Sequence, residues 1–351
     1  MTDEVSDTKP RRRRAGKGVR IEQVAQEAGV SITTVSRALN YPDSVSERTR
    51  ALIWAAIEST GYVPNRLAGS LATSRSQTVG LVIPHISSSI FADSVKGLAD
   101  KLAAANYELL LGLSGYSAQR ELEHVRAFLS QRVAGLVLTG FSRAPETRRL
   151  LSDAGIPVVE TSDLGANPLD MVVGFSNRDA ARAMVNHLES CGYSRIALIS
   201  LPTLDNDREL ARREGYIAQI NASGGTPVIV EAANGVAGGA AAFQTLRSQA
   251  PEVDAIFCTN DTLAAGCVLE AQRQGIQVPS ELGIAGFGDV ELAQEFVPTL
   301  TTIRVRRHEI GSCSGSLLLE RMSGNTPAET TIDLGFQVLP RGSTRRRRET
   351  V

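Results

Sequence analysis

The sequence of residues 19–40 is VRIEQVAQEAGVSITTVSRALN, and its apolar spacing predicts two short helices joined by a tight turn. The apolar residues expected between them are Ile21, Val24, Ala25 and Ala28 from the first helix and Val35, Ala38 and Leu39 from the second. Gly29 suits a left-handed turn, where a Cβ is costly, and Ser31 is a good N-cap for the second helix. These features together are typical of a helix-turn-helix.

The start of the second helix carries the residues that this arrangement leaves exposed. Those expected to contact nucleic acid are Ser31, Ile32, Thr33, Thr34, Ser36 and Arg37. In a helix-turn-helix, these positions face base edges and phosphates in the major groove. A plain helical hairpin with a polar face has the same spacing, so the spacing alone leaves both interpretations open.

A third helix and a linker are predicted next. The helix starts after its N-cap, Ser46, and ends at Gly61. Its expected buried stripe consists of Leu52, Ile53, Ala56 and Ile57. In residues 65–77, Leu67 and Leu71 lie four positions apart on one face of a helix of about eight residues. Isolated helices that short are marginal in water, so we expect this hinge helix to form only with support from elsewhere.

The hydrophobic pattern changes at Thr78. From there to residue 287, short runs rich in Val, Ile and Leu alternate with amphipathic helical stretches. This alternation predicts parallel sheets with helices on both faces. About 260 residues is long for one such unit, so we expect two doubly wound α/β halves that divide near residues 175–177. A ligand of such a body lies at the carboxyl ends of the strands, in the cleft between the halves.

The expected organisation has five parts. They are a basic arm at residues 1–18, a helix-turn-helix domain at 19–64, a hinge helix and linker at 65–77, the two-part α/β body at 78–340 and a basic tail at 341–351. Within the body, we assign residues 78–175 plus 304–330 to one half and residues 176–303 plus the C-terminal strands to the other.

Charge is distributed unevenly along the chain, which has 351 residues and a formal net charge of −1. Residues 1–78 carry 12 basic and 8 acidic side chains, and residues 341–351 carry 5 and 1. Residues 79–340 carry 20 basic and 29 acidic side chains. A basic head and a basic tail therefore flank an acidic body, and a basic head suits contact with phosphates.

Several functional classes are excluded by what the sequence lacks. No apolar run approaches the roughly 18 residues of a membrane span, and the N-terminal residues are not those of a signal peptide. The four cysteines are scattered, the four histidines lack metal-ligand spacing, and we find no nucleophile elbow or phosphate-binding loop. We therefore expect a cytoplasmic, nucleoid-associated protein that is neither a membrane protein nor an enzyme, and that needs no metal or cofactor.

Two strings in the head resemble a known family. AGVSITTVSRALN at residues 28–40 and GYVPNRLAGSLAT at 61–73 are similar to the DNA-binding head of the LacI/GalR family of bacterial repressors. The resemblance implies that Ile32, Thr33 and Arg37 read or flank bases in the major groove. It also implies hinge contacts with DNA by Asn65, Arg66, Ala68, Leu71 and Ala72, with Leu71 wedged into the minor groove at the centre of a palindrome.

The resemblance continues through the body, in strings such as VGLVIP, FCTNDTLAAG, GIAGFGD and RGST. It implies a fold like that of periplasmic sugar-binding proteins, used to sense a metabolite. The residues expected to bind this effector are His85, Phe91, Arg208, Arg212, Asn260, Phe287 and Asp289. Arg212 offers a bidentate fork, and Arg208 lies one helical turn earlier, so both cations can converge on one anion. The alternative is that Arg208 and Glu209 are solvated surface charges.

One departure from the family pattern concerns the effector. Members that sense sugars or nucleobases commonly have an acidic pair after the aromatic residue at 287, whereas this chain has Gly288 and Asp289. Loss of a carboxylate removes repulsion of an anion. The segments at residues 91–93, 172–177 and 257–261 also resemble the gluconate-type branch. The expectation is a homodimeric repressor that a sugar acid releases from a palindromic operator; a neutral-sugar or corepressor-dependent regulator is the alternative.

A periplasmic binding protein would share the body, but it needs a signal peptide and has no helix-turn-helix. A sugar-metabolising enzyme would need a catalytic base or a cofactor motif, and the sequence shows neither. Both classes therefore fit the sequence less well than a regulator.

Overall fold

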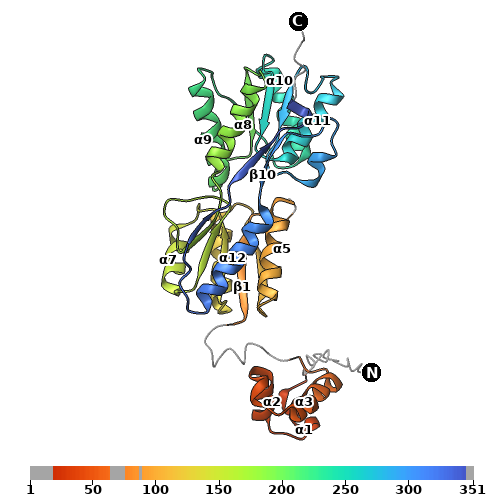
Figure 1. Ribbon diagram of the computed structural model, residues 1–351, viewed down its shortest axis with the longest axis vertical. Coiled ribbons are helices and arrows are strands. Elements are labelled where there is room, and N and C mark those ends of the chain that lie inside the picture. Colours follow the sequence, from red (N-terminus) through yellow and green to blue (C-terminus); the bar gives the residue numbers. More distant parts are fainter. Residues whose placement is uncertain (1–18, 64–75, 87–88, 345–351) are drawn as a thin grey trace, which may run out of the picture. The chain divides into compact units, whose positions relative to one another are not determined.

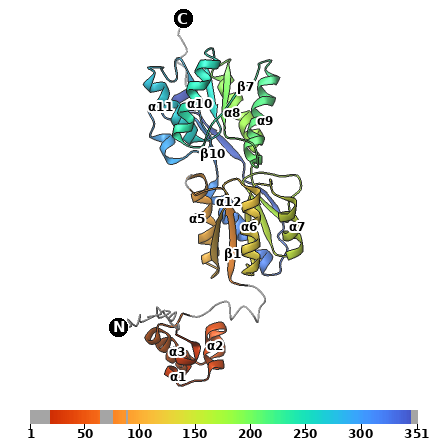
Figure 2. The ribbon, with the colours of Figure 1, turned by 180° about the vertical axis from the view of Figure 1, so that it is seen from behind.

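The chain forms two compact units, residues 1–76 and residues 77–351. The computed structural model (Figures 1 and 2) describes residues 19–63, 76–86 and 89–344. The first unit is here called the head and the second the body. Among the described residues, no helix is both long and apolar enough to cross a membrane.

In its described residues, the head has three α-helices and contains the predicted helix-turn-helix. Its elements are α1 (Ile21–Ala28), α2 (Ile32–Asn40), the short 3-10 helix η1 (Pro42–Ser44) and α3 (Glu47–Thr60). Gly29 has a φ of 64°, and the Ser31 hydroxyl accepts the Thr34 N–H at 3.1 Å. Gly61 also has a φ of 64°, which ends α3. The predicted turn at Gly29, the N-cap Ser31 and the helix end at Gly61 are thus confirmed. Val24, Val35 and Ile53 lie in the core between the three helices.

One predicted core residue of the head is wrong. Leu52 is 50% exposed, whereas Ile53 and Ala56 are buried. Successive residues on an α-helix are separated by about 100°, so Leu52 lies to one side of the stripe that includes Ile53, Ala56 and Ile57. Trp54, on the opposite side of that stripe, is 48% exposed.

The first lobe of the body is a six-stranded parallel sheet with helices on both faces. Its strands are β1 (Thr78–Ile83), β2 (Glu108–Leu113), β3 (Gly135–Thr139), β4 (Val158–Thr161), β5 (Met171–Gly174) and β11 (Thr331–Asp333), in the order β2-β1-β3-β4-β5-β11. Its helices are α5 (Ser89–Ala103), α6 (Ala118–Ser130), α7 (Pro145–Ala154) and α12 (Arg307–Met322). The pair α5 and α12 covers one face, and α6 and α7 cover the other (Figures 1 and 2).

The second lobe repeats this plan around a four-stranded parallel sheet. Its strands are β6 (Ile196–Ser200), β7 (Val228–Glu231), β8 (Ala255–Cys258) and β9 (Gly283–Ala285), in the order β7-β6-β8-β9. Its helices are α8 (Asn177–Ser190), α9 (Asp207–Ala222), α10 (Val236–Gln249) and α11 (Asp261–Arg273), with the short 3-10 helices η2 (Glu291–Gln294) and η3 (Gly342–Thr344). Helices α10 and α11 pack on one face and α8 and α9 on the other. Both expected doubly wound halves are therefore present.

The chain passes between the lobes three times. The first passage follows β5, the second follows β10 (Thr302–Val305), and the third follows β11. The third leads to β12 (Phe336–Leu339), which pairs antiparallel with β10. Strand β11 pairs in parallel with β5 of the first lobe, although we expected the C-terminal strands in the second half. A three-residue edge strand has no hydrophobic periodicity that a sequence pattern could detect.

Candidate DNA-binding head and effector cleft

The predicted DNA-contacting residues of α2 lie at its N-cap and in its first two turns. Ser31, Ile32, Thr33 and Arg37 are exposed, and Thr34 and Ser36 are half-buried. Ile32 leaves 47% of its surface in solvent, although isoleucine is usually buried. The Ser31 and Thr34 hydroxyls lie 2.8 Å apart, so both belong to the cap as well as to the exposed surface. The hinge residues predicted to contact DNA (Asn65, Arg66, Ala68, Leu71 and Ala72) lie outside the described residues.

A cavity of about 40 Å³ lies between the two lobes. The residues that line it are His85, Phe91 and Tyr116 from the first lobe and Leu201, Asn206, Glu209, Arg212, Asn234 and Asn260 from the second. Most of them closely follow a strand: His85 follows β1, Tyr116 follows β2, and Asn260 follows β8. The cavity therefore occupies the carboxyl ends of both sheets, where the sequence placed the ligand.

Arg212 is held in place from several sides. Its Nε donates to Asn177 Oδ1 at 2.9 Å, and its Nη1 donates to the Thr259 carbonyl at 2.9 Å. Nη1 also lies 3.5 Å from Glu209 Oε2, and the guanidinium carbon is 4.0 Å from the centre of the Phe287 ring. Burial raises the pKa of Glu209, although the Arg212 charge opposes that rise. Nη2 takes no part in these contacts.

Arg208 and Glu209 are buried, with 6% and 1% of their surfaces exposed, so the alternative that they are surface charges is wrong. The Arg208 guanidinium carbon lies 6.0 Å from the centre of the Tyr116 ring. Arg208 lines a hollow next to this interlobe cavity, together with Thr139 and Ser142, and Tyr116 lines both spaces. The two arginines therefore lie near the same cleft but contact different groups.

Phe287 and Asp289 are not among the residues that line the cavity. Phe287 is 1% exposed and lies beneath the Arg212 guanidinium. Both carboxylate oxygens of Asp289 are occupied: Arg304 Nε donates to Oδ2 and Arg341 Nη2 donates to Oδ1, each at 2.7 Å. Gly288 has a φ of 127°, so backbone conformation is a second reason for a glycine there, besides the charge argument.

Comparison with known proteins identifies the family of this architecture. Residues 20–65 match the model described as "Bacterial regulatory proteins, lacI family". Residues 76–338 match the model described as "Periplasmic binding proteins and sugar binding domain of LacI family". The chain belongs to the LacI family. As such, it is a DNA-binding transcriptional regulator.

Individual LacI family members are similar over most of the chain. The HTH-type transcriptional regulator GntR of Escherichia coli is 35% identical over 325 residues, which cover 92% of this chain and 98% of that protein. A LacI family regulator from Silicibacter pomeroyi has a crystal structure with a TM-score of 0.88 and 31% identity, covering 93% of this chain and 100% of that one. The structure of GntR from Chromobacterium violaceum has a TM-score of 0.72 and 35% identity, over 76% and 99% of the two chains.

Several cavity residues of this LacI family chain were missed in the sequence. They are Tyr116, Leu201, Asn206, Glu209 and Asn234. Tyr116 has a φ of 63°, an uncommon conformation for a non-glycine residue, and its hydroxyl lies 3.4 Å from His85 Nε2. Tyr116, Leu201 and Asn234 follow the ends of strands on the edge of the sheet that faces the cleft, and this position is the signal that could have found them. Asn206 and Glu209 lie at the start of α9.

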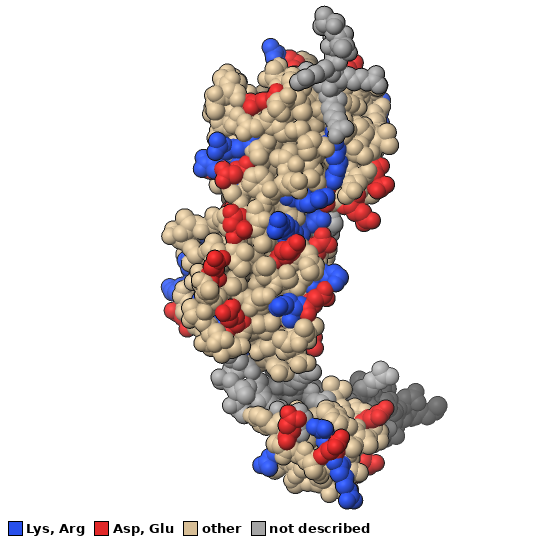
Figure 3. All heavy atoms as spheres, in the orientation of Figure 1, with Lys and Arg blue, Asp and Glu red and all other residues tan. Residues whose placement is uncertain are grey.

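Charged groups outside the cleft form no single patch on the face of the LacI family body drawn in Figure 3, where acidic and basic side chains lie interspersed. Among the described residues, no group of three or more His, Cys, Asp or Glu side chains is placed to hold a metal ion. The candidate ligand site is the interlobe cavity, which residues of both lobes line.

Proposed function

We propose that the chain is a homodimeric repressor that leaves a palindromic operator when a sugar acid, such as gluconate, binds in the interlobe cleft. The observation that carries the proposal is Arg212, a half-buried cation whose fixed guanidinium belongs to a residue that lines the interlobe cavity. A guanidinium fixed in this way binds a carboxylate with little loss of side-chain freedom. The similarity to regulators named GntR and IdnR supports the same branch of the family.

The remaining wall of the cavity suits a polyhydroxylated ligand. Asn206, Asn234 and Asn260 bring side-chain amides to the cavity, and His85 and Tyr116 add an imidazole and a hydroxyl. Asn260 Oδ1 already accepts the Leu263 N–H at 2.8 Å, which leaves its amide NH₂ to donate to a ligand hydroxyl. Phe91 supplies an apolar surface for the carbon chain. The cavity therefore has a partner for the acid group of such a ligand and partners for its hydroxyl groups.

The position of the cavity connects binding to movement of the lobes. Residues of both lobes line it, so a ligand that enters contacts both and can shift one lobe against the other. A shift of this kind transmitted to the head lowers operator affinity by about 5–150-fold, which corresponds to about 1–3 kcal/mol of coupling.

The proposal is tested with the purified full-length protein. Its operator is selected from random DNA, and thermal shifts are measured with gluconate, ketogluconates, their phosphates, glucose and purines. We expect salt-dependent binding to a palindrome, stabilisation by sugar acids and release of the DNA by the same acids. Stabilisation only by glucose or purines would overturn the sugar-acid assignment. Absence of palindrome-specific binding would overturn the proposed binding to a palindromic operator. Sedimentation is expected to show a dimer, and a stable tetramer would contradict that part.

A further inference from the structure

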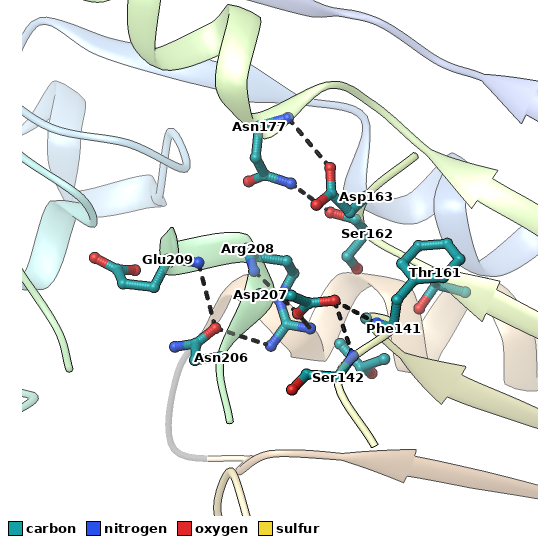
Figure 4. Close-up of polar contacts among 12 residues, drawn as sticks. Phe141, Ser142, Thr161, Ser162, Asp163, Asn177, Asn206, Asp207, Arg208 and Glu209 are labelled. Carbon is teal, nitrogen blue, oxygen red and sulfur yellow. Dashed lines mark hydrogen bonds and ion pairs between the residues drawn. The ribbon is translucent and has the colours of Figure 1, made fainter. Parts of the chain in front are cut away.

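Asp207 joins the two lobes beside the cleft. It is the first residue of α9 in the second lobe, and its Oδ2 accepts the backbone N–H groups of Phe141 and of Ser142, the latter at 3.1 Å (Figure 4). Phe141 and Ser142 belong to the loop after β3 of the first lobe. Oδ1 accepts the backbone N–H of Arg208 at 2.9 Å, so the carboxylate is also bonded to the start of its own helix. Hydrogen bonds to an ionised carboxylate are about twice as strong as neutral ones.

The loop that Asp207 contacts is supported from inside the first lobe. Arg143 Nη2 donates to the Gly140 carbonyl, and the Arg143 side chain is 1% exposed. Arg143 Nη1 lies 3.1 Å from Glu160 Oε1, and Glu160 Oε2 accepts the Leu169 N–H at 2.6 Å. This ion pair supports, from inside the first lobe, the loop whose N–H groups Asp207 contacts.

The approach of the two lobes depends on a glycine. A Cβ at Gly140 would stand 2.5 Å from Asp207 Oδ1 and still closer to Arg208 Nη1. Gly140 also has a φ of 76°, which disfavours other residues. The first lobe is therefore shaped to let the carboxylate of the second lobe reach its backbone.

The neighbours of Asp207 place this contact at the cleft. Asn206 lines the effector cavity, and Arg208 lines the adjacent hollow with Ser142. We propose that Asp207 is a gate residue: its hydrogen bonds to the loop hold the lobes together beside the cavity, and their opening limits the rate at which a ligand enters and leaves. The part that concerns ligand exchange rests on the proposed function, whereas the interlobe contact does not.

The contact itself is tested by hydrogen exchange in the full-length protein without ligand. The Phe141 and Ser142 amides are expected to exchange about tenfold faster or more in Asp207→Ala than in the wild type, because their acceptor is lost. Asp207→Asn, which keeps the shape and an acceptor oxygen but not the charge, is expected to fall between them. Asp179→Asn is the matched control, since Asp179 is an exposed acid in the first turn of α8 that pairs with Arg182 of the same helix. Equal exchange of these two amides in the wild type and Asp207→Ala would overturn the proposal.

The gating role is tested by surface plasmon resonance with gluconate on the same variants. Asp207→Ala is expected to raise the association and dissociation rate constants together by about tenfold, with a smaller change in their ratio, as expected for removal of a barrier. The gating role would be overturned if only one rate constant changed, or if neither changed although the Phe141 and Ser142 amides exchange hydrogen faster. If gluconate binds neither the wild type nor the variants, the sugar-acid assignment fails, and the exchange experiment still decides the interlobe contact.

Discussion

Replacing Arg212 by methionine separates two roles that the structure gives to this side chain. Arg212 pairs with Glu209, and the two side chains are only 12% and 2% exposed. Removing one partner of a buried pair leaves an uncompensated charge and costs about 3–5 kcal/mol. A domain is stable by only about 5–15 kcal/mol, so we expect Arg212→Met to remain folded but to unfold at clearly lower urea concentrations.

The double variant Glu209→Gln, Arg212→Met removes both charges. It leaves no unpaired buried carboxylate, so we expect it to recover most of the lost stability. It still lacks the guanidinium that the proposed function assigns to the acid, and we therefore expect no recovery of effector binding. The two properties should thus respond differently to the second substitution.

Urea denaturation followed by circular dichroism and calorimetric titration with gluconate measure these two quantities. Arg213→Met is the control, since Arg213 pairs with Glu231 at the surface and its loss should cost about 0–1 kcal/mol. A stability loss below about 1 kcal/mol for Arg212→Met would refute the reasoning about the buried pair. Normal gluconate binding by the double variant would remove Arg212 from the effector site.

Three further predictions concern the head, the hinge and the body. Ser31→Ala removes the N-cap of α2 and should destabilise the head by about 1 kcal/mol. Fluorescence of Trp54, the one tryptophan of the chain, reports unfolding of the head, and an unchanged melting temperature would contradict the capping role. Leu71→Ala should weaken operator binding in a mobility-shift assay and leave gluconate affinity unchanged; equal loss of both would contradict the predicted minor-groove role. Burial raises the pKa of Asp261 to about 6, above its ordinary value of 3.8, so protonation favours the folded state. The stability of the wild type relative to Asp261→Asn should therefore fall by roughly 2 kcal/mol between pH 4 and pH 7, and urea titrations that show a constant difference would exclude this.

The head could be predicted almost entirely from sequence because its determinants are local. Gly29, Ser31 and Ser46 act on residues at most a few positions away, through a left-handed turn and two N-caps. Leu52 is the exception. Neighbouring side chains on a helix point about 100° apart, so a buried stripe that is drawn one residue too wide includes an exposed side chain.

The cleft could be predicted only in part because its neighbours are far apart in the sequence. Four predicted effector residues do line the cavity: His85, Phe91, Arg212 and Asn260. Their roles stay predictions. No local pattern could show that Arg304 and Arg341 occupy the carboxylate of Asp289, because those contacts need the last strands to return beside the second sheet.

The three passages between the lobes have a consequence for synthesis. The first lobe lacks α12 and β11 until residue 333 has been made, so neither lobe can finish folding as a continuous piece of chain. The three described α-helices of the head are complete at residue 60. At translation rates of about 5–20 residues per second, the interval is on the order of 10–50 s. Each new molecule therefore has a folded head before it has the sensor that controls it, and a ribosome that stops early releases a head without one.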